Sequence, residues 1–262
     1  MTNRNGSKGV AVTQDTHAKN PGFFAKIYRL LFHEDVYYRI GGYLIFGLLL
    51  FFIAWASFQF LIKKPNLLAD SFMVQKLVSS TTAKTFGTWG TEHFGKTLTL
   101  FKWQLDVAKE FDIWGNVLVL TFKYFVNHLI FVIPFIFLLN FFKVGRWNFG
   151  AIYFAFYTIL WGAVIGTQSL SFPTGTNVAL GSLILFARFG LWTWFSYLLL
   201  VVGTAQFGWL VAPNLSGWAW KQERKLWPVH FTPEQREVFI YGLLFLLASS
   251  FAEARIFVHY NL

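Results

Sequence analysis

The stretch Phe189–Val211 constrains the fold most, because it contains no charged side chain. At about 1.5 Å rise per residue, a helix of this length crosses the roughly 30 Å hydrocarbon core of a bilayer. Arg188 precedes the stretch, Pro213 follows it, and tryptophans stand near both of its ends, as is typical of membrane interfaces. The sequence therefore predicts a transmembrane helix here, the alternative being a buried helix of a soluble core.

Other segments share this character, and together they predict an all-α fold, a polytopic transmembrane helical bundle of about five spans. The remaining spans are expected within residues 41–63, 117–142, 148–166 and 239–258. Gly162 and Gly166 have the spacing at which two small residues let another helix approach closely. The composition agrees with a membrane protein, because 55% of the 262 residues are hydrophobic.

Polarity divides the chain into regions. The expected organisation is a disordered cytoplasmic tail (1–20), an amphipathic interfacial helix (21–40), the first transmembrane helix (41–63), an extracytoplasmic loop or cap (64–112) and a four-helix transmembrane bundle (113–262). In the second region, apolar residues recur at helical spacing with Lys26 and Arg29 between them. Such a segment either lies on the membrane surface or forms the start of the first bundle helix.

Charge predicts the orientation of the bundle. The net charge is +10, and the basic residues stand mainly beside the apolar segments. With five spans, the N-terminal tail, the turn at Lys143 and Arg146 and the loop around Arg224 share one side, and all three are net basic. Residues 66–112 are balanced in charge and residues 167–177 are uncharged, and both lie on the other side. The positive-inside rule therefore predicts a cytoplasmic (inner) membrane protein with a cytoplasmic N-terminus.

The basic segment with Lys221, Arg224 and Lys225 is interleaved with tryptophans. A nucleic-acid surface uses the same residue types, but beside a membrane they are expected to contact lipid headgroups or a partner. We therefore expect membrane lipids and other integral membrane subunits as partners, and no nucleic acid.

Ionisable residues inside the predicted spans are costly, so each is a candidate for function. The members of a possible intramembrane polar cluster are Lys123, Asn127, His128, Arg188, Glu253 and Arg255. Lys123, Arg188 and Glu253 fall at similar depth, which suggests an ion-pair cluster that ties three helices together, with a proton relay as the alternative. Lys123 by itself would snorkel to the outer surface. His128 either hydrogen-bonds to a neighbouring helix or ligates a metal, haem or chlorophyll.

Motifs of common enzyme classes are missing from the sequence. It contains no phosphate-binding glycine loop, no HExxH and no nucleophile elbow. It also contains no cysteine, which excludes a thiolate metal site. We therefore expect no enzymatic activity, no catalytic residue and no metal site, while the cofactor question stays open at His128.

A series of features follows in order along the C-terminal half of the chain. They are Phe125–His128, Trp161–Thr167, Gly175–Asn177 with Gly181, Gly203–Pro213 and Ala248–Ala254. In this order they resemble the family of stage II sporulation protein M. Members of that family have an Asn-containing helix start, a Gly-rich helix pair, an uncharged Asn-Gly-type loop, a Gly-Trp-x-x-x-x-Pro-like stretch and a carboxylate on the last helix. The resemblance implies a five-span, non-enzymatic membrane component that works with partners.

Three functions are compatible with these patterns. The leading expectation is a structural or assembly subunit of a membrane complex. A transporter or permease subunit would place His128, Asn127 and Glu253 around a polar cavity. A pigment- or haem-binding subunit of an energy-converting membrane complex would use His128 as a ligand.

Overall fold

The computed structural model describes residues 22–65, 67–68, 113–169, 186–214, 219–223 and 230–259. Within these ranges the fold is mostly helical, and four helices are long and apolar enough to cross a membrane. They are Val36–Ile62, Val117–Asn140, Phe149–Gly166 and Pro233–Arg255. The predicted helical membrane bundle is thereby confirmed in its general form. The predicted tail (1–20) and nearly all of the predicted cap (64–112) lie outside the described residues.

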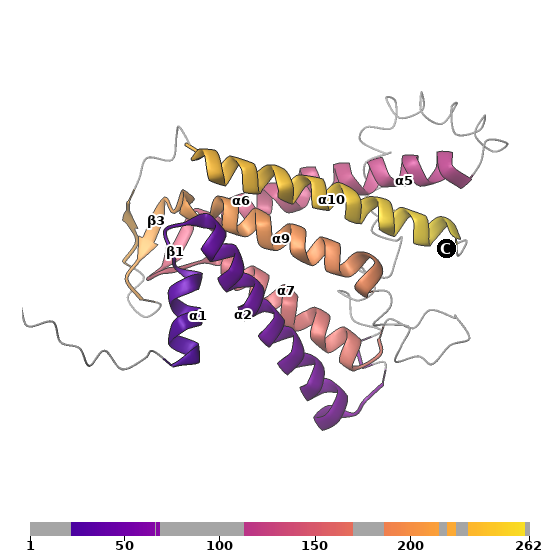
Figure 1. The fold of residues 1–262 in the computed structure, drawn as a ribbon, viewed down its shortest axis with the longest axis horizontal. Helices are drawn as coiled ribbons and strands as arrows, with labels where there is room; N and C mark the ends of the chain where they lie inside the picture. Colours follow the sequence, from indigo (N-terminus) through magenta and orange to yellow (C-terminus); the bar gives the residue numbers. More distant parts are fainter. Residues whose placement is uncertain are drawn as a thin grey trace, which may run out of the picture.

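The N-terminal part of the bundle contains two separate helices. Helix α1 (Phe23–Leu31) runs crosswise to the long helices in Figure 1, and α2 (Val36–Ala56) runs along the bundle and continues as the π-helical segment η1 (Ser57–Ile62). The Asp35 carboxylate caps α2 by accepting the Tyr37 N–H at 2.8 Å. The amphipathic segment predicted for 21–40 is therefore shorter, and its last residues belong to α2.

The second long helix changes its hydrogen bonding near its middle. It consists of α5 (Ile113–Asn127), the π-helical segment η2 (His128–Val132) and α6 (Ile133–Asn140). Pro134 has no N–H to donate to the preceding turn, and the Ile133 N–H bonds to the His128 carbonyl one residue further back than in an α-helix. Proline therefore explains the widened turn.

A tight hairpin joins this helix to α7 (Phe149–Gly166). Its strands are β1 (Phe142–Val144) and β2 (Trp147–Asn148), and Gly145 in the turn has a φ of +59°. The Asn148 side chain caps α7 by accepting the Ala151 N–H at 3.1 Å. The two helices accordingly run in opposite directions, as the basic turn predicts.

The stretch predicted as one helix over 189–211 is divided. A π-helical segment η3 (Phe186–Gly190), α9 (Leu191–Thr204) and a 3₁₀ turn η4 (Ala205–Phe207) are followed by strand β3 (Leu210–Ala212). Strand β3 pairs in parallel with β1 and antiparallel with β4 (Lys221–Gln222), which gives the sheet order β2-β1-β3-β4. This small sheet lies at one end of the bundle, here called the sheet end (Figure 1). No local sequence pattern indicates this sheet, because each strand has only two or three residues and the pairing of β1 with β3 joins segments that are distant in the chain.

The last helix, α10 (Pro233–His259), leaves the sheet end and packs on α9 and α5. Its start carries a capping box, in which the Thr232 N–H donates to Gln235 Oε1 at 3.0 Å and the Gln235 N–H donates to Thr232 Oγ1 at 3.3 Å.

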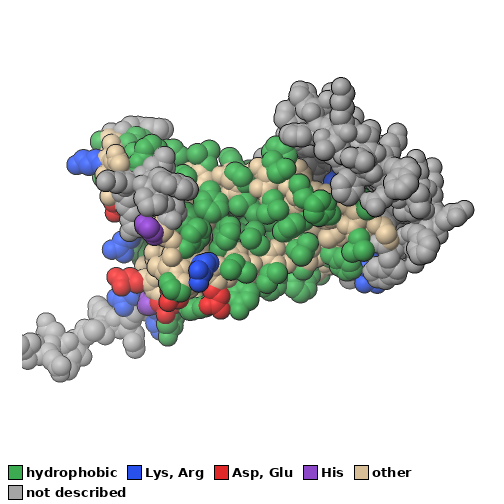
Figure 2. All heavy atoms as spheres, turned by 90° about the horizontal axis from the view of Figure 1, so that it is seen from above, with side chains coloured by type: hydrophobic (Ala, Val, Ile, Leu, Met, Phe, Trp, Pro, Cys, Tyr) green, Lys and Arg blue, Asp and Glu red, His purple; other side chains and the backbone are tan. Residues whose placement is uncertain are grey.

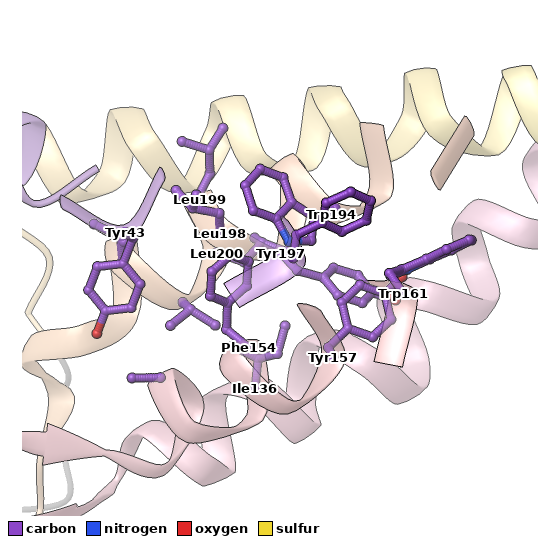
Figure 3. Close-up of a cluster of buried hydrophobic side chains, with 14 of the residues drawn as sticks. Tyr43, Ile136, Phe154, Tyr157, Trp161, Trp194, Tyr197, Leu198, Leu199 and Leu200 are labelled. Carbon is purple, nitrogen blue, oxygen red and sulfur yellow. The ribbon is translucent and has the colours of Figure 1, made fainter. Parts of the chain in front are cut away.

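Helix α9 occupies the centre of the bundle and contacts α2, α6, α7 and α10. Residues Leu198–Val202 are all buried, and Figure 3 shows Trp194, Tyr197 and Leu200 among the aromatic side chains of α7. On α2, a Cβ at Gly47 would collide with the Trp194 ring. This uncharged stretch of the chain is thus enclosed by protein from Leu198 to Thr204.

The outside of the bundle is apolar over its middle (Figure 2). We define the apolar belt as the large hydrophobic side chains that are exposed on α2, α5, α6, α7 and α10. The belt includes Phe52, Ile53, Leu118, Phe122, Phe135, Leu138, Ile152, Phe156, Leu244 and Leu247, together with Ile130 of η2. A monomeric soluble protein rarely exposes so much contiguous apolar surface, so the belt matches the hydrocarbon core of a bilayer.

The predicted close approach at Gly162 and Gly166 is confirmed. A Cβ at Gly162 would lie 2.6 Å from the Phe51 carbonyl oxygen of α2, and one at Gly166 would lie 2.7 Å from that of Trp55. These two glycines let the backbones of α2 and α7 touch.

Gly162→Ala should therefore lower the free energy of unfolding by about 1–3 kcal/mol, since the obstructing Phe51 atom is backbone and cannot rotate away. Thermal unfolding followed by tryptophan fluorescence measures the loss. Gly41→Ala on α2 is the matched control, because a Cβ there meets no atom within 4 Å. Equal melting temperatures for the two variants would contradict the close packing.

Candidate functional site

Helix α9 is hydrogen-bonded to the helices on two of its sides. The Trp194 Nε1–H donates to Thr158 Oγ1 of α7 at 2.7 Å. The Ser196 hydroxyl donates to the Gly242 carbonyl oxygen of α10 at 2.8 Å. Both bonds satisfy a buried side chain in an apolar interior, so they fix the rotation of α9 against its neighbours.

Asn140 connects three helices at the sheet end and is fully buried. Its Nδ2 donates to the Val201 carbonyl oxygen at 3.2 Å and to Thr204 Oγ1, both on α9. Its Oδ1 accepts from Asn148 Nδ2 at 2.7 Å, next to the start of α7. A Cβ at Gly150 would collide with Asn140 Oδ1, so the carboxamide fills the space that this glycine leaves.

A second polar group lies near the middle of the bundle. Tyr197 OH and His128 Nδ1 are 3.2 Å apart, and His128 stands midway along its long helix. The rings of Tyr157 and Tyr197 are 4.9 Å apart between centroids, and those of Tyr153 and Tyr157 are 6.2 Å apart. We call these four residues the histidine–tyrosine cluster. Figure 3 shows Tyr157 and Tyr197 turned toward one another.

Glu253 of α10 lies near this cluster. Its carboxylate interacts electrostatically with the phenol groups of Tyr124, Tyr157 and Tyr197. One turn earlier on α10, the Ser249 hydroxyl is hydrogen-bonded to Thr193 of α9. The carboxylate of Glu253 on α10 therefore lies within electrostatic range of Tyr157 on α7 and Tyr197 on α9.

The structure divides the predicted polar cluster. His128 contacts Tyr197, and Glu253 interacts electrostatically with the same tyrosine, while Asn127 is half-buried beside His128. The side chains of Lys123, Arg188 and Arg255 are exposed instead.

The expected ion-pair cluster of Lys123, Arg188 and Glu253 does not form among the described residues. Arg188 points outward from η3 and Lys123 points outward from α5, whereas Glu253 is half-buried. Similar depth in the membrane is therefore not sufficient, because the three side chains leave their helices in different directions.

The contact of Lys221, Arg224 and Lys225 with lipid headgroups or a partner stays a prediction. Lys221 is exposed on β4 at the sheet end, while Arg224 and Lys225 lie outside the described residues.

Metal binding has no candidate in the described ranges, where no three His, Cys, Asp or Glu side chains come together. The contact between His128 and Tyr197 favours the interpretation of this histidine as a hydrogen-bonding residue between helices.

Comparison of the chain with protein families, with curated proteins and with solved structures finds no match. The class of protein is therefore defined by the fold itself, as a helical membrane protein with a protein-enclosed central helix.

Sequence reasoning missed Asn140, Thr158 and Ser196. The signal was present, because each is an uncharged polar residue inside a predicted span. The candidates were chosen because they are ionisable, and these three residues carry no charge. In an apolar interior, however, a carboxamide or hydroxyl also requires a hydrogen-bond partner.

Asn140→Ala should lower the free energy of unfolding by about 1–3 kcal/mol, because it leaves buried partners on α9 and α7 unsatisfied. Asn127→Ala is the matched control on the same long helix, since in the described ranges that side chain forms no hydrogen bond. Denaturant titration in mild detergent measures both, and a comparable loss for the control would refute the role of Asn140.

Proposed function

We propose that the chain is a non-enzymatic, multi-pass membrane protein that serves as a structural or assembly subunit of a membrane complex. The observation that carries the proposal is the separation of polar and apolar groups. The bundle's described Asn, Ser and Thr side chains are largely used in bonds within or between helices, and the apolar belt faces outward. A protein of this kind interacts with lipids and with other membrane helices through its outer faces.

Five crossings are part of this proposal. Helix α7 leads away from the sheet end and α10 starts at the sheet end, so the segment between them has to return (Figure 1). The segments η3, α9 and η4 form that return path and end at β3 in the sheet. Although α9 is shorter than the long helices beside it, its stretch Leu198–Thr204 is buried by them and needs no lipid-facing surface.

The proposed location is the cytoplasmic membrane, with the sheet end and the N-terminus in the cytoplasm. The sheet end carries Lys143 and Arg146 in its short hairpin and Lys221 on β4. Basic residues in short connections favour the cytoplasmic side. The resemblance to stage II sporulation protein M belongs to the proposal as well, since it implies a component that works with partners.

A permease subunit is the second candidate, because His128 and Glu253 both interact with Tyr197 in the interior. Such a protein would move a solute past the histidine–tyrosine cluster. A cofactor-binding subunit would instead show visible absorbance that disappears in His128→Ala.

Purification from native membranes in mild detergent, followed by mass spectrometry, tests the leading proposal. We expect other integral membrane proteins to co-purify in fixed stoichiometry. An unrelated multi-pass protein carrying the same tag, expressed to the same level, is the control for detergent-induced association. A chain that purifies alone or with copies of itself would contradict the subunit role, and solute uptake by reconstituted vesicles would then test the permease.

The number of crossings and the orientation have a separate test. The natural chain has no cysteine, so Lys64→Cys, Arg146→Cys and Leu262→Cys each provide one labelling site. In intact cells, a membrane-impermeant maleimide should label Lys64→Cys and Leu262→Cys. It should label Arg146→Cys only after the cells have been permeabilised. Protection of Leu262→Cys with labelling of Lys64→Cys would show an even number of crossings.

A further inference from the structure

Helix α1 is fixed firmly to the sheet end of the bundle. Its buried side chains, Ile27 and Leu31, belong to the main hydrophobic core. Its backbone comes so close to α2 that a Cβ at Gly42 would lie 2.7 Å from the Leu30 carbonyl carbon. The crosswise direction of α1 in Figure 1 is therefore part of the packed fold.

Arg39 holds the connection between α1 and α2. Its side chain is buried, and its Nε and Nη2 donate to the His33 carbonyl oxygen at 3.0 and 2.7 Å. Nη2 also donates to the Glu34 carbonyl oxygen at 3.2 Å. These bonds satisfy carbonyl groups left free where α1 ends, so Arg39 sets the angle between the two helices.

The first half of α1 exposes aromatic side chains. Phe23, Phe24 and Tyr28 have exposed fractions of 58%, 79% and 43%. With 100° between successive residues, they flank the direction of Ile27 and Leu31, so one apolar face continues along the helix. The bundle covers this face near the C-terminal end of α1 and leaves it uncovered near the N-terminal end.

Charge indicates what covers the exposed part. Lys26 and Arg29 occupy the opposite side of α1, are exposed, and have no acidic residue on their own helix. On the neighbouring helix α2, Tyr37 and Tyr38 are exposed beside the same end of the bundle, where aromatic residues mark a membrane interface. A helix parallel to the membrane, with an apolar face and basic residues behind it, matches a surface of anionic headgroups.

We propose that α1 is a built-in binding element for anionic phospholipid. Phe23, Phe24 and Tyr28 insert at the level of the headgroups and upper acyl chains of the leaflet at the sheet end. Lys26 and Arg29 reach lipid phosphates through their long side chains, and Arg39 holds the helix at the required angle. The proposal requires the membrane embedding of the bundle and is independent of its role as a subunit.

The test uses single-cysteine variants of the full chain in nanodiscs, labelled with an environment-sensitive NBD fluorophore. Phe24→Cys samples the apolar face, and Ala25→Cys, the neighbouring exposed position, samples the basic side. In discs containing phosphatidylglycerol, the label at 24 should be quenched by lipids with a nitroxide near the headgroup and shielded from aqueous iodide. The label at 25 should instead be quenched by aqueous iodide and little affected by the nitroxide lipids.

Charge reversal separates anionic lipid from a general apolar attraction. Adding Lys26→Glu and Arg29→Glu to Phe24→Cys should increase iodide quenching several-fold in anionic discs and change it little in phosphatidylcholine discs. Adding Arg39→Gln should make the labels at 24 and 25 respond alike, because the angle of α1 is no longer fixed. Melting temperatures of all variants show whether the bundle remains folded.

Two results would overturn the proposal. One is equal iodide quenching at 24 and 25 in anionic discs with the bundle folded. The other is that the label at position 24 is shielded in cells but not in nanodiscs of purified chain and lipid. In that case a photocrosslinker at position 24 would capture a protein in cells. The second result would assign the exposed aromatic residues to a protein partner.

Discussion

A polar group in an apolar interior requires a hydrogen-bond partner, and in this bundle many of those partners lie on α9. Trp194 bonds to α7, Ser196 to α10 and Tyr197 to η2, while the C-terminal end of α9 receives the Asn140 carboxamide of α6. Each such bond between membrane helices contributes about 0.6 kcal/mol on average, so the set contributes only a few kcal/mol. Packing supplies most of the stability, and the bonds select one arrangement among those that packing would allow.

The enclosure of α9 leaves the outer helices to face the membrane. Residues such as Ile53, Phe122, Phe156 and Leu244 are exposed on four different helices, whereas Leu198–Val202 of α9 are buried. Hydropathy does not distinguish these two groups, because lipid and protein interior are both apolar. The faces available to partners are therefore those of α2, α5, α6, α7 and α10, and not the buried stretch of α9.

Much of the fold could be predicted from the sequence because its signals are local. The apolar segments, the basic turn at Lys143 and Arg146, and the glycine pair Gly162 and Gly166 each depend on residues close together in the chain. The pairing of β1 with β3 could not be predicted, since it joins Phe142–Val144 to Leu210–Ala212 and no local pattern marks it.

The candidate site was predicted less well than the fold. His128 and Glu253 were identified from their cost in a membrane, and both interact with Tyr197. Their partners were not identified, because contacts between helices depend on the rotation of each helix about its axis. Arg188 shows this dependence, since its side chain is exposed on η3 and does not pair with Glu253.

The central proposal is that α9 crosses the membrane inside a shell of protein. The most direct measurement is carbene footprinting of the unmodified chain in nanodiscs with a lipid-soluble diazirine, mapped residue by residue by mass spectrometry. The account predicts strong labelling at Ile53, Phe122, Phe156 and Leu244, and almost none along Leu198–Val202. Labelling of α9 as strong as that of α10 would contradict the account, because it would place the central helix in contact with lipid.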